Sequence, residues 1–135
     1  MKTFDVQNIE VKVNAERAFD YIAEAGNLPD WTNAFAKAGN GRARMVTPDG
    51  EVDIGLAVVS DRNTGIIDWV LSFPDGSVAK AFSRVMALES SRCLYSFTLT
   101  PPPVPLEALE GALEAQSRTL AEELATLKLR LENLP

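Results

Sequence analysis

The chain contains no histidine, only one cysteine and no glycine-rich phosphate loop. Without an imidazole, Ser-His-Asp and Cys-His nucleophile activation, histidine-containing zinc sites and a histidine general base are all excluded. The glycines are scattered singly in turn-like settings, such as the Pro-Asp-Gly triplets at 48–50 and 74–76, so nucleotide chemistry is not supported. Any catalysis must use carboxylates, tyrosine, lysine or arginine, and no cofactor or metal is implied.

Basic residues are also scarce. The 13 Lys and Arg residues are outnumbered by 19 Asp and Glu residues, which leaves a net charge of -6. Nucleic-acid binding depends on clustered cations, so no nucleic-acid partner is expected. Cys93 has no second cysteine to pair with, the first residues alternate in polarity, and no apolar run approaches the ~20 residues that span a bilayer. We therefore expect a cytoplasmic protein without a membrane span.

The sequence does contain enough apolar material for one core, since 46% of its 135 residues are hydrophobic. This length favours a single domain over residues 1–135. Alternating residues at the N-terminus predict a long first strand. Its phase changes between Val6 and Ile9, which indicates a bulge near Gln7 and Asn8.

Two short helices are expected after this strand. Asn14 is a suitable N-cap for a helix from about Ala15 to Ala25, and Gly26 suits the left-handed position after its end. Pro29 then suits the first turn of the second helix.

From about Arg42 onward, five β segments are separated by turn-forming sequences, which predicts an antiparallel meander. Arg44 and Asp53 are expected to face each other as a cross-strand ion pair.

The register can be argued from the large apolar residues, because a slip of one residue would turn them all outward. Centring the last turn on Ser90–Ser91 places Arg84 opposite Phe97. The same rule applied one turn earlier places Trp69 opposite Phe82. This register predicts a heavily aromatic inner face and an outer face of mostly small residues, among them Ala81 and Ser83.

The prolines within 101–105 end the sheet, and a long helix is predicted from Pro105 to about Asn133. At ~1.5 Å per residue, it is about 43 Å long, enough to lie across a whole sheet. Gln116 and Ser117 interrupt its leucine stripe. The stripe consists of Leu106, Leu109, Leu113, Leu120, Leu124, Leu127 and Leu131.

This order of elements, and above all the stretch VNAERAFDYIAEAGNLPDW at Val13–Trp31, resembles the START-like superfamily, also called SRPBCC and often labelled polyketide cyclase/dehydrase-like. The likeness covers essentially the whole chain. It implies an α+β helix-grip fold, in which a curved antiparallel sheet wraps around the long C-terminal helix and two short helices follow the first strand. It also implies a cavity for lipids, sterols, polyketides or other apolar molecules, although some members are chaperone-activating or antitoxin-like proteins. A shared fold does not assign an activity.

Arg84 is the strongest candidate for a functional residue, because the inferred register points its guanidinium group into an aromatic interior. A buried cation needs a partner. That partner is either Glu123 or Glu110 on the helix, the face of Trp69, or the carboxylate of a ligand.

For each of the other candidates, both a functional role and a purely structural role are possible interpretations. Gln116 and Ser117 either bind a polar group of a ligand or simply fit the helix surface. Trp31 and Phe35 lie near a cavity entrance or belong to the core. The inner-face candidates line a pocket or fill it, and they are Trp69, Phe82, Tyr95, Phe97 and Leu113.

Three functions remain open. The first is binding of a small apolar molecule, lipid- or polyketide-like and with or without a negative charge. The second is a cyclase- or dehydratase-type enzyme that uses Tyr95 as an acid and Arg84 as an electrostatic stabiliser. The third is a non-enzymatic interaction module with a filled core, for which the weakly charged outer face suggests a homodimer.

Overall fold

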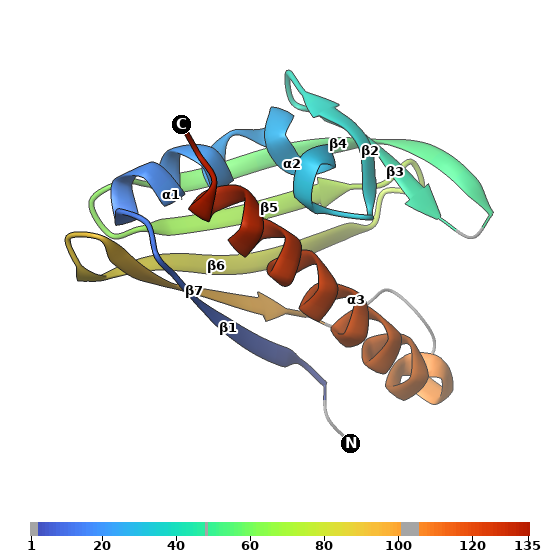
Figure 1. The fold of residues 1–135 in the computed structure, drawn as a ribbon. Coiled ribbons are helices and arrows are strands. Elements are labelled where there is room, and N and C mark those ends of the chain that lie inside the picture. The colour runs from blue at the N-terminus through green and yellow to red at the C-terminus, as the bar shows by residue number, and fades with distance from the viewer. Residues whose placement is uncertain (1–2, 48, 101–105) are drawn as a thin grey trace.

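The computed structural model describes residues 3–47, 49–100 and 106–135, and the side chains of all of these except 106–111. Seven strands form one antiparallel sheet in the order β1-β7-β6-β5-β4-β3-β2. The helices α1, α2 and α3 cover one face of it, and α3 crosses this face toward α1 (Figure 1). We call the helix-covered face the inner face and the opposite one the outer face. The elements are β1 (Asp5–Val11), α1 (Ala15–Ala23), the 3-10 helix η1 (Ala25–Asn27), α2 (Leu28–Trp31), β2 (Phe35–Gly39), β3 (Arg42–Thr47), β4 (Gly50–Asp61), β5 (Ile66–Ser72), β6 (Val78–Glu89), β7 (Arg92–Leu99) and α3 (Leu106–Glu132).

This architecture is the α+β helix-grip arrangement that the resemblance implies, with a curved sheet, a long C-terminal helix and short helices after the first strand. In the part of the chain that the structure describes, no helix is long and apolar enough to cross a membrane.

The start of α1 follows its sequence signal. The side chain of Asn14 accepts hydrogen bonds from the backbone N–H groups of Glu16 (2.9 Å) and Arg17 (3.3 Å), as an N-cap does. The predicted left-handed Gly26 is wrong, because α1 ends at Ala23 and Gly26 lies inside η1 without a positive φ. The carboxylate of Glu24 accepts from the Gly26 N–H at 3.1 Å, and this contact continues the chain into η1. Pro29 lies in the first turn of α2, as predicted.

The predicted bulge in β1 is also wrong. The pairing of β1 with β7 is continuous, from Asp5 opposite Leu99 to Val11 opposite Cys93. The change of phase has another cause, since Val6 lies exposed on the outer face and the inner positions of the strand begin with polar residues.

The strand β2 has no clear sequence signal, because its residues FAKAG lack the β-branched side chains typical of strands. It forms by pairing with β3, and the register shifts between Phe35 and Lys37. In the next hairpin, Arg44 lies opposite Asp53 with 3.0 Å between Nε and Oδ1, which confirms the predicted ion pair.

The predicted register is wrong for β6. The turn at Ser90–Ser91 is as expected, since Glu89 lies opposite Arg92, but a bulge between Ala87 and Glu89 shifts every later pair. Val85 therefore lies opposite Tyr95, and Ser83 lies opposite Phe97.

The other end of β6 agrees with this shift. Ser72 pairs with Val78, the Phe73 N–H donates to the Ser77 carbonyl oxygen, and Gly76 has φ 89°. This is a loop with an odd number of residues and glycine at the left-handed position. Ala81 then lies opposite Trp69 in place of the expected Phe82. Only in β6 are the inner and outer residues exchanged relative to the prediction, since the large residues of β4, β5 and β7 face inward as predicted.

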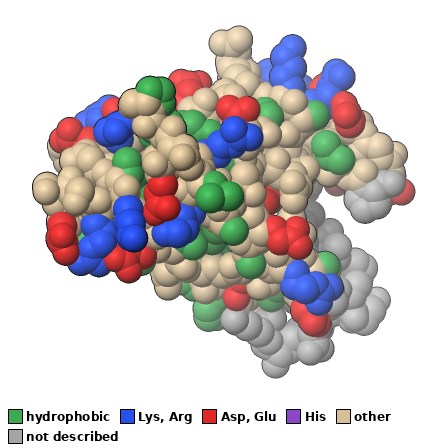
Figure 2. Space-filling model, in the orientation of Figure 1, with side chains coloured by type: hydrophobic (Ala, Val, Ile, Leu, Met, Phe, Trp, Pro, Cys, Tyr) green, Lys and Arg blue, Asp and Glu red, His purple; other side chains and the backbone are tan. Residues whose placement is uncertain are grey.

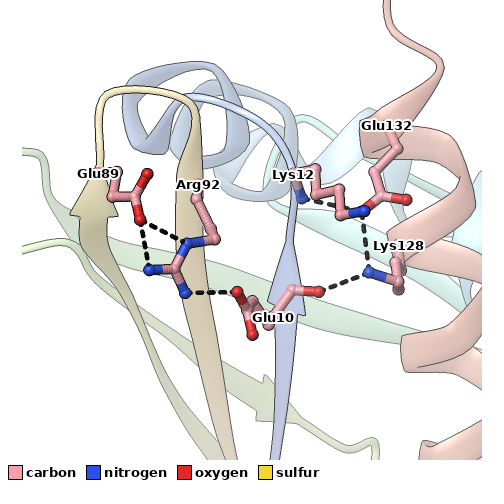
Figure 3. A network of polar contacts seen from close by, with 6 residues as sticks. All are labelled: Glu10, Lys12, Glu89, Arg92, Lys128 and Glu132. Atoms are coloured by element: carbon pink, nitrogen blue, oxygen red, sulfur yellow. Dashed lines mark hydrogen bonds and ion pairs between the residues drawn. The ribbon is translucent and has the colours of Figure 1, made fainter.

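The C-terminal part of α3 is fastened to the free edge of β1 (Figure 3). Lys128 Nζ donates to the Glu10 carbonyl oxygen at 2.7 Å, and the Lys12 N–H donates to Glu132 at 2.8 Å. Lys128 and Glu132 also form an ion pair at 2.9 Å. On the other side of the strand, Arg92 pairs with the Glu10 carboxylate. Helix side chains thus satisfy backbone groups that an edge strand would otherwise leave exposed.

Candidate functional site

The aromatic side chains of β5 and β7 form the centre of the inner face. The rings of Trp69 and Phe97 are 5.7 Å apart at 31°, and those of Tyr95 and Phe97 are 6.4 Å apart at 67°. All three side chains are buried. Because alternate residues of a strand face the same side, Tyr95 and Phe97 of β7 both face inward, and Phe97 lies against Trp69 on β5 of the same sheet. The expected inner aromatic cluster is therefore present for these three residues.

Within the part of the chain that the structure describes, three buried side-chain atoms have no hydrogen-bond partner. They are Nε1 of Trp31, Nε1 of Trp69 and the hydroxyl oxygen of Tyr95. The three side chains are 3%, 4% and 0% exposed, respectively. Buried donors are almost always bonded to protein, water or a ligand, because an unbonded one costs about 1–3 kcal/mol. Three such groups within the core are therefore unusual for a packed interior.

Burial raises the pKa of Tyr95 above its ordinary value, and the nearby Ser83 hydroxyl opposes this rise only in part. Ser83 donates its own hydrogen to the Ile67 carbonyl oxygen at 2.5 Å, so it does not donate to the tyrosine. The Tyr95 hydroxyl is thus neutral at physiological pH and has its hydrogen available for an acceptor.

Charge is nearly absent from the interior. Among the described residues, Asp5 is the only buried ionisable side chain apart from Tyr95 and Cys93. Its carboxylate accepts from Ser117 Oγ at 2.6 Å and from Gln7 Nε2 at 2.8 Å, and Gln7 also donates to the Ser117 carbonyl oxygen at 2.8 Å. Ser117 therefore joins α3 to β1, and the neighbouring Gln116 is exposed.

Arg84 and Phe82 do not belong to the inner site. Both lie on the outer face, since the bulge in β6 gives the inner positions to Ala81, Ser83 and Val85. Arg84 Nε donates to the Thr64 carbonyl oxygen at 2.8 Å. This is none of the partners considered from the sequence, and an inward-facing cation for a ligand carboxylate is therefore ruled out at this position.

The remaining candidates occupy different depths. Trp31 is buried at the end of α2, and Phe35 is half-buried against the core at the start of β2. Leu113 is buried but is not part of the main core cluster. Glu123, considered as a partner of Arg84, instead accepts the Asn33 N–H at 2.6 Å, and burial raises the pKa of its carboxyl.

Neither of two hollows on the described surface touches the three unpartnered groups. One, of about 360 Å³, lies between α1 and the turn before β5, where the Arg62 guanidinium covers the Phe19 ring at 5.3 Å. The other, of about 300 Å³, lies on the outer face beside Phe82. Figure 2 shows the helix-covered side, on which acidic and basic side chains are intermingled.

Sequence reasoning missed two inner-face residues. Ser83 was assigned to the outer face, and Asp5 was not singled out. The sequence FPDGS contained a signal for Ser83, because glycine in the third position of the loop is typical of a three-residue hairpin connection. Nothing in the sequence indicates that Asp5 meets Ser117, which is 112 residues away.

Solved structures with the same fold come from several bacteria. The protein XoxI from Bacillus cereus has a TM-score of 0.71 and 16% identity, with 98% of this chain and 97% of that chain covered. A START superfamily protein from Mycobacterium smegmatis has a TM-score of 0.71 and 14% identity, with 99% and 100% covered. The Zhui aromatase/cyclase from Streptomyces sp. R1128 has a TM-score of 0.67 and 12% identity, with 96% and 93% covered. No protein-family model matches the sequence, and no curated protein matches it.

Proposed function

The chain has the START-like helix-grip fold, and from this premise we propose that it binds a small, uncharged, largely apolar molecule on the inner face of the sheet. The observation that carries the proposal is the set of three buried and unpartnered groups on Trp31, Trp69 and Tyr95. Solved structures of similar fold include an aromatase/cyclase, which supports a binding role for this interior without assigning it.

The chemistry of these groups restricts the ligand. The two indole N–H groups only donate, and the tyrosine hydroxyl both donates and accepts. A molecule that satisfies them therefore carries carbonyl, ether or hydroxyl oxygens. A carboxylate is disfavoured, because the described interior has no cation and Arg84 faces the other way.

A neutral ligand therefore takes the place of the anionic one considered from the sequence. The hypothesis of an enzyme that uses Tyr95 and Arg84 together is also excluded, because the two side chains are on opposite faces of the sheet. The described residues bring no second catalytic pair together in its place, and we propose binding without a reaction.

Native mass spectrometry on protein purified from its own cell extract tests the proposal. We expect a bound neutral molecule that is released on denaturation. Tyr95→Phe should lower its occupancy or affinity about 10-fold, as the loss of one buried hydrogen bond predicts. Tyr21→Phe is the matched control, since Tyr21 lies half-buried on α1 and has no place in the site.

The proposal fails if nothing co-purifies and if fatty acids, sterols and aromatic ketones all leave the melting temperature unchanged. It also fails if Tyr95→Phe and Tyr21→Phe affect binding equally. A core without a ligand would favour the interaction-module reading, for which the outer face provides a separate argument.

A further inference from the structure

The outer face of the sheet has several large apolar side chains open to solvent. They lie on or directly before β1 and on β6, β5 and β4, while β7, which runs between β1 and β6, contributes the polar Ser96 and Thr98. Solvent-exposed apolar residues that gather on one face indicate an interaction surface, whereas single ones need no explanation. The exposed residues of this patch are Phe4, Val6, Val59, Ile66 and Phe82.

Four residues at its centre form a square. Phe82 and Arg84 are alternate residues of β6, and Ile66 and Asp68 are alternate residues of β5. Ile66 pairs with Arg84 and Trp69 pairs with Ala81, which places Asp68 opposite Phe82. The apolar side chains therefore occupy one diagonal of the square, and the two opposite charges occupy the other.

The two charges are not paired with each other. Arg84 uses Nε on the Thr64 carbonyl oxygen, which leaves its terminal nitrogens for another acceptor. Asp68 accepts only a long hydrogen bond of 3.4 Å from the Ser83 N–H. The hollow of about 300 Å³ opens between these residues and is also lined by Ser96 and Thr98.

We propose that this face binds a second copy of the chain, about a two-fold axis that runs along the Phe82–Ile66 diagonal. Reflection across that diagonal exchanges the positions of Asp68 and Arg84. Each Phe82 then packs against the partner subunit's Phe82, and each Asp68 faces the partner subunit's Arg84. The strands of the two sheets cross at a steep angle, which is one of the two common ways in which sheets pack.

A second copy is favoured over an unrelated protein because the square is complementary to itself. An isologous interface requires that each group meets its complement when the patch is turned onto an identical one. Here one apolar diagonal meets itself, and the charged diagonal forms two equivalent ion pairs. This inference is independent of the proposed ligand.

The size of the patch sets the strength of the dimer. Five strands lie about 4.8 Å apart, and the outward-facing residues along each strand are about 6.8 Å apart. Three rows of such residues across the five strands cover roughly 500 Å² of sheet. A stable interface buries about 800 Å² on each partner, so the expected dimer is weak, with a Kd in the micromolar range or above.

Sedimentation equilibrium from about 10 µM to about 1 mM tests the proposal, because this range spans the expected Kd. Asp68→Arg and Arg84→Asp should each weaken the dimer at least about 10-fold, and the double variant should restore it to within about 3-fold of the original chain. Arg118→Asp is the control, since it makes the same change of charge on an exposed residue of α3. Circular dichroism confirms that each variant is folded.

Cysteine cross-linking gives a second, independent measurement. Ile66→Cys places a thiol on the proposed axis, where it meets its own copy and should form a disulfide-linked dimer on oxidation. Leu129→Cys is the matched control on the exposed side of α3. Cys93 is fully buried and should not contribute.

A chain that stays monomeric up to about 1 mM overturns the proposal, because even a weak interface of this area would be populated there. Dimerisation that is unchanged by both charge reversals, or not restored in the double variant, overturns the paired charges. Equal cross-linking of Ile66→Cys and Leu129→Cys overturns the location of the axis.

Discussion

Phe97 and Phe82 lie on neighbouring strands of the same sheet, yet one is 9% exposed and the other 41%. Phe97 faces inward and contacts Trp69 and Tyr95. Phe82 faces outward beside Asp68 and Arg84. The comparison shows that residue type does not separate the two faces here, because both contain large aromatic side chains. What separates the two faces is which alternate residues of β6 point inward, and this depends on one bulge and one hairpin loop.

The largest expected effect comes from truncating one phenylalanine on each face. Phe97→Ala should lower the free energy of unfolding by about 3–5 kcal/mol, because it leaves a cavity among buried rings. Phe82→Ala should lower it by less than about 1 kcal/mol, since the exposed ring loses little contact. Urea denaturation of the two variants measures the difference. Equal losses would contradict the assignment of the two rings to opposite faces.

The position of β6 depends on a close contact at Gly65. A Cβ at this residue would lie 2.0 Å from the Val85 carbonyl oxygen, and φ is +80°. Gly65→Ala should therefore destabilise the chain by about 3 kcal/mol. Gly76→Ala is the matched control, because Gly76 has a similar φ of +89° with nothing near its Cβ position. It should cost only about 1–2 kcal/mol. Thermal unfolding of both variants would show whether the contact, rather than the dihedral angle, sets the larger loss.

A smaller effect on stability is expected from a substitution on the inner face. Tyr95→Phe removes a buried hydroxyl that lacks a partner, so the ligand-free chain should gain up to about 1 kcal/mol. The raised pKa of Tyr95 has its own consequence. Below the unfolded pKa of about 10 the tyrosine is neutral in both states, and above it only the unfolded state loses the proton, so stability falls as pH rises.

Tyr95→Phe should make this alkaline loss less steep by up to about 1.4 kcal/mol per pH unit. Urea denaturation at pH 7 and at several values above pH 10 tests both expectations. A loss of stability at pH 7 would mean that the hydroxyl already has a partner in the ligand-free protein.

The smallest effect is expected where α3 contacts the edge strand β1. The hydrogen bond from Lys128, together with the Lys12 N–H, holds the pKa of Glu132 below its usual range. This stabilisation is present above the unfolded pKa of about 4.3 and is lost as pH falls through the lower folded value. Glu132→Gln should therefore cost about 0.5 kcal/mol near pH 7 and nothing at acidic pH, because the pair is close to solvent. A cost that is the same at pH 7 and pH 3 would show that the charge is not the cause.

Much of the fold could be predicted from local signals. Asn14, Pro29 and the leucine stripe each act over a few neighbouring residues, and the structure contains the helix features that they indicate, with the stripe buried from Leu113 to Leu131. The predicted helix start at Pro105 and the side chains of Leu106 and Leu109 lie outside the described part of the chain. The same is true of the Arg44 and Asp53 pair, which depends on a single tight turn.

The prediction of the candidate site was less complete. Trp69, Tyr95 and Phe97 face the interior as expected, because β5 and β7 alternate without interruption. Arg84 and Phe82 were assigned to the wrong face, since the predicted register assumed an even loop between β5 and β6 and no bulge in β6. A bulge adds a residue without any marked change in hydrophobicity, so a pattern of alternation cannot detect it.

The sequence by itself determined the order of most elements, the N-cap of α1, the absence of histidine chemistry and the aromatic content of the core. These depend on residue identity and on contacts within a turn or two. Only the tertiary structure decided which face receives Arg84, that Asp5 meets Ser117, and which buried donors lack a partner. Each of these depends on how strands far apart in the chain come into register, and that register follows from the packing of the whole sheet against α3.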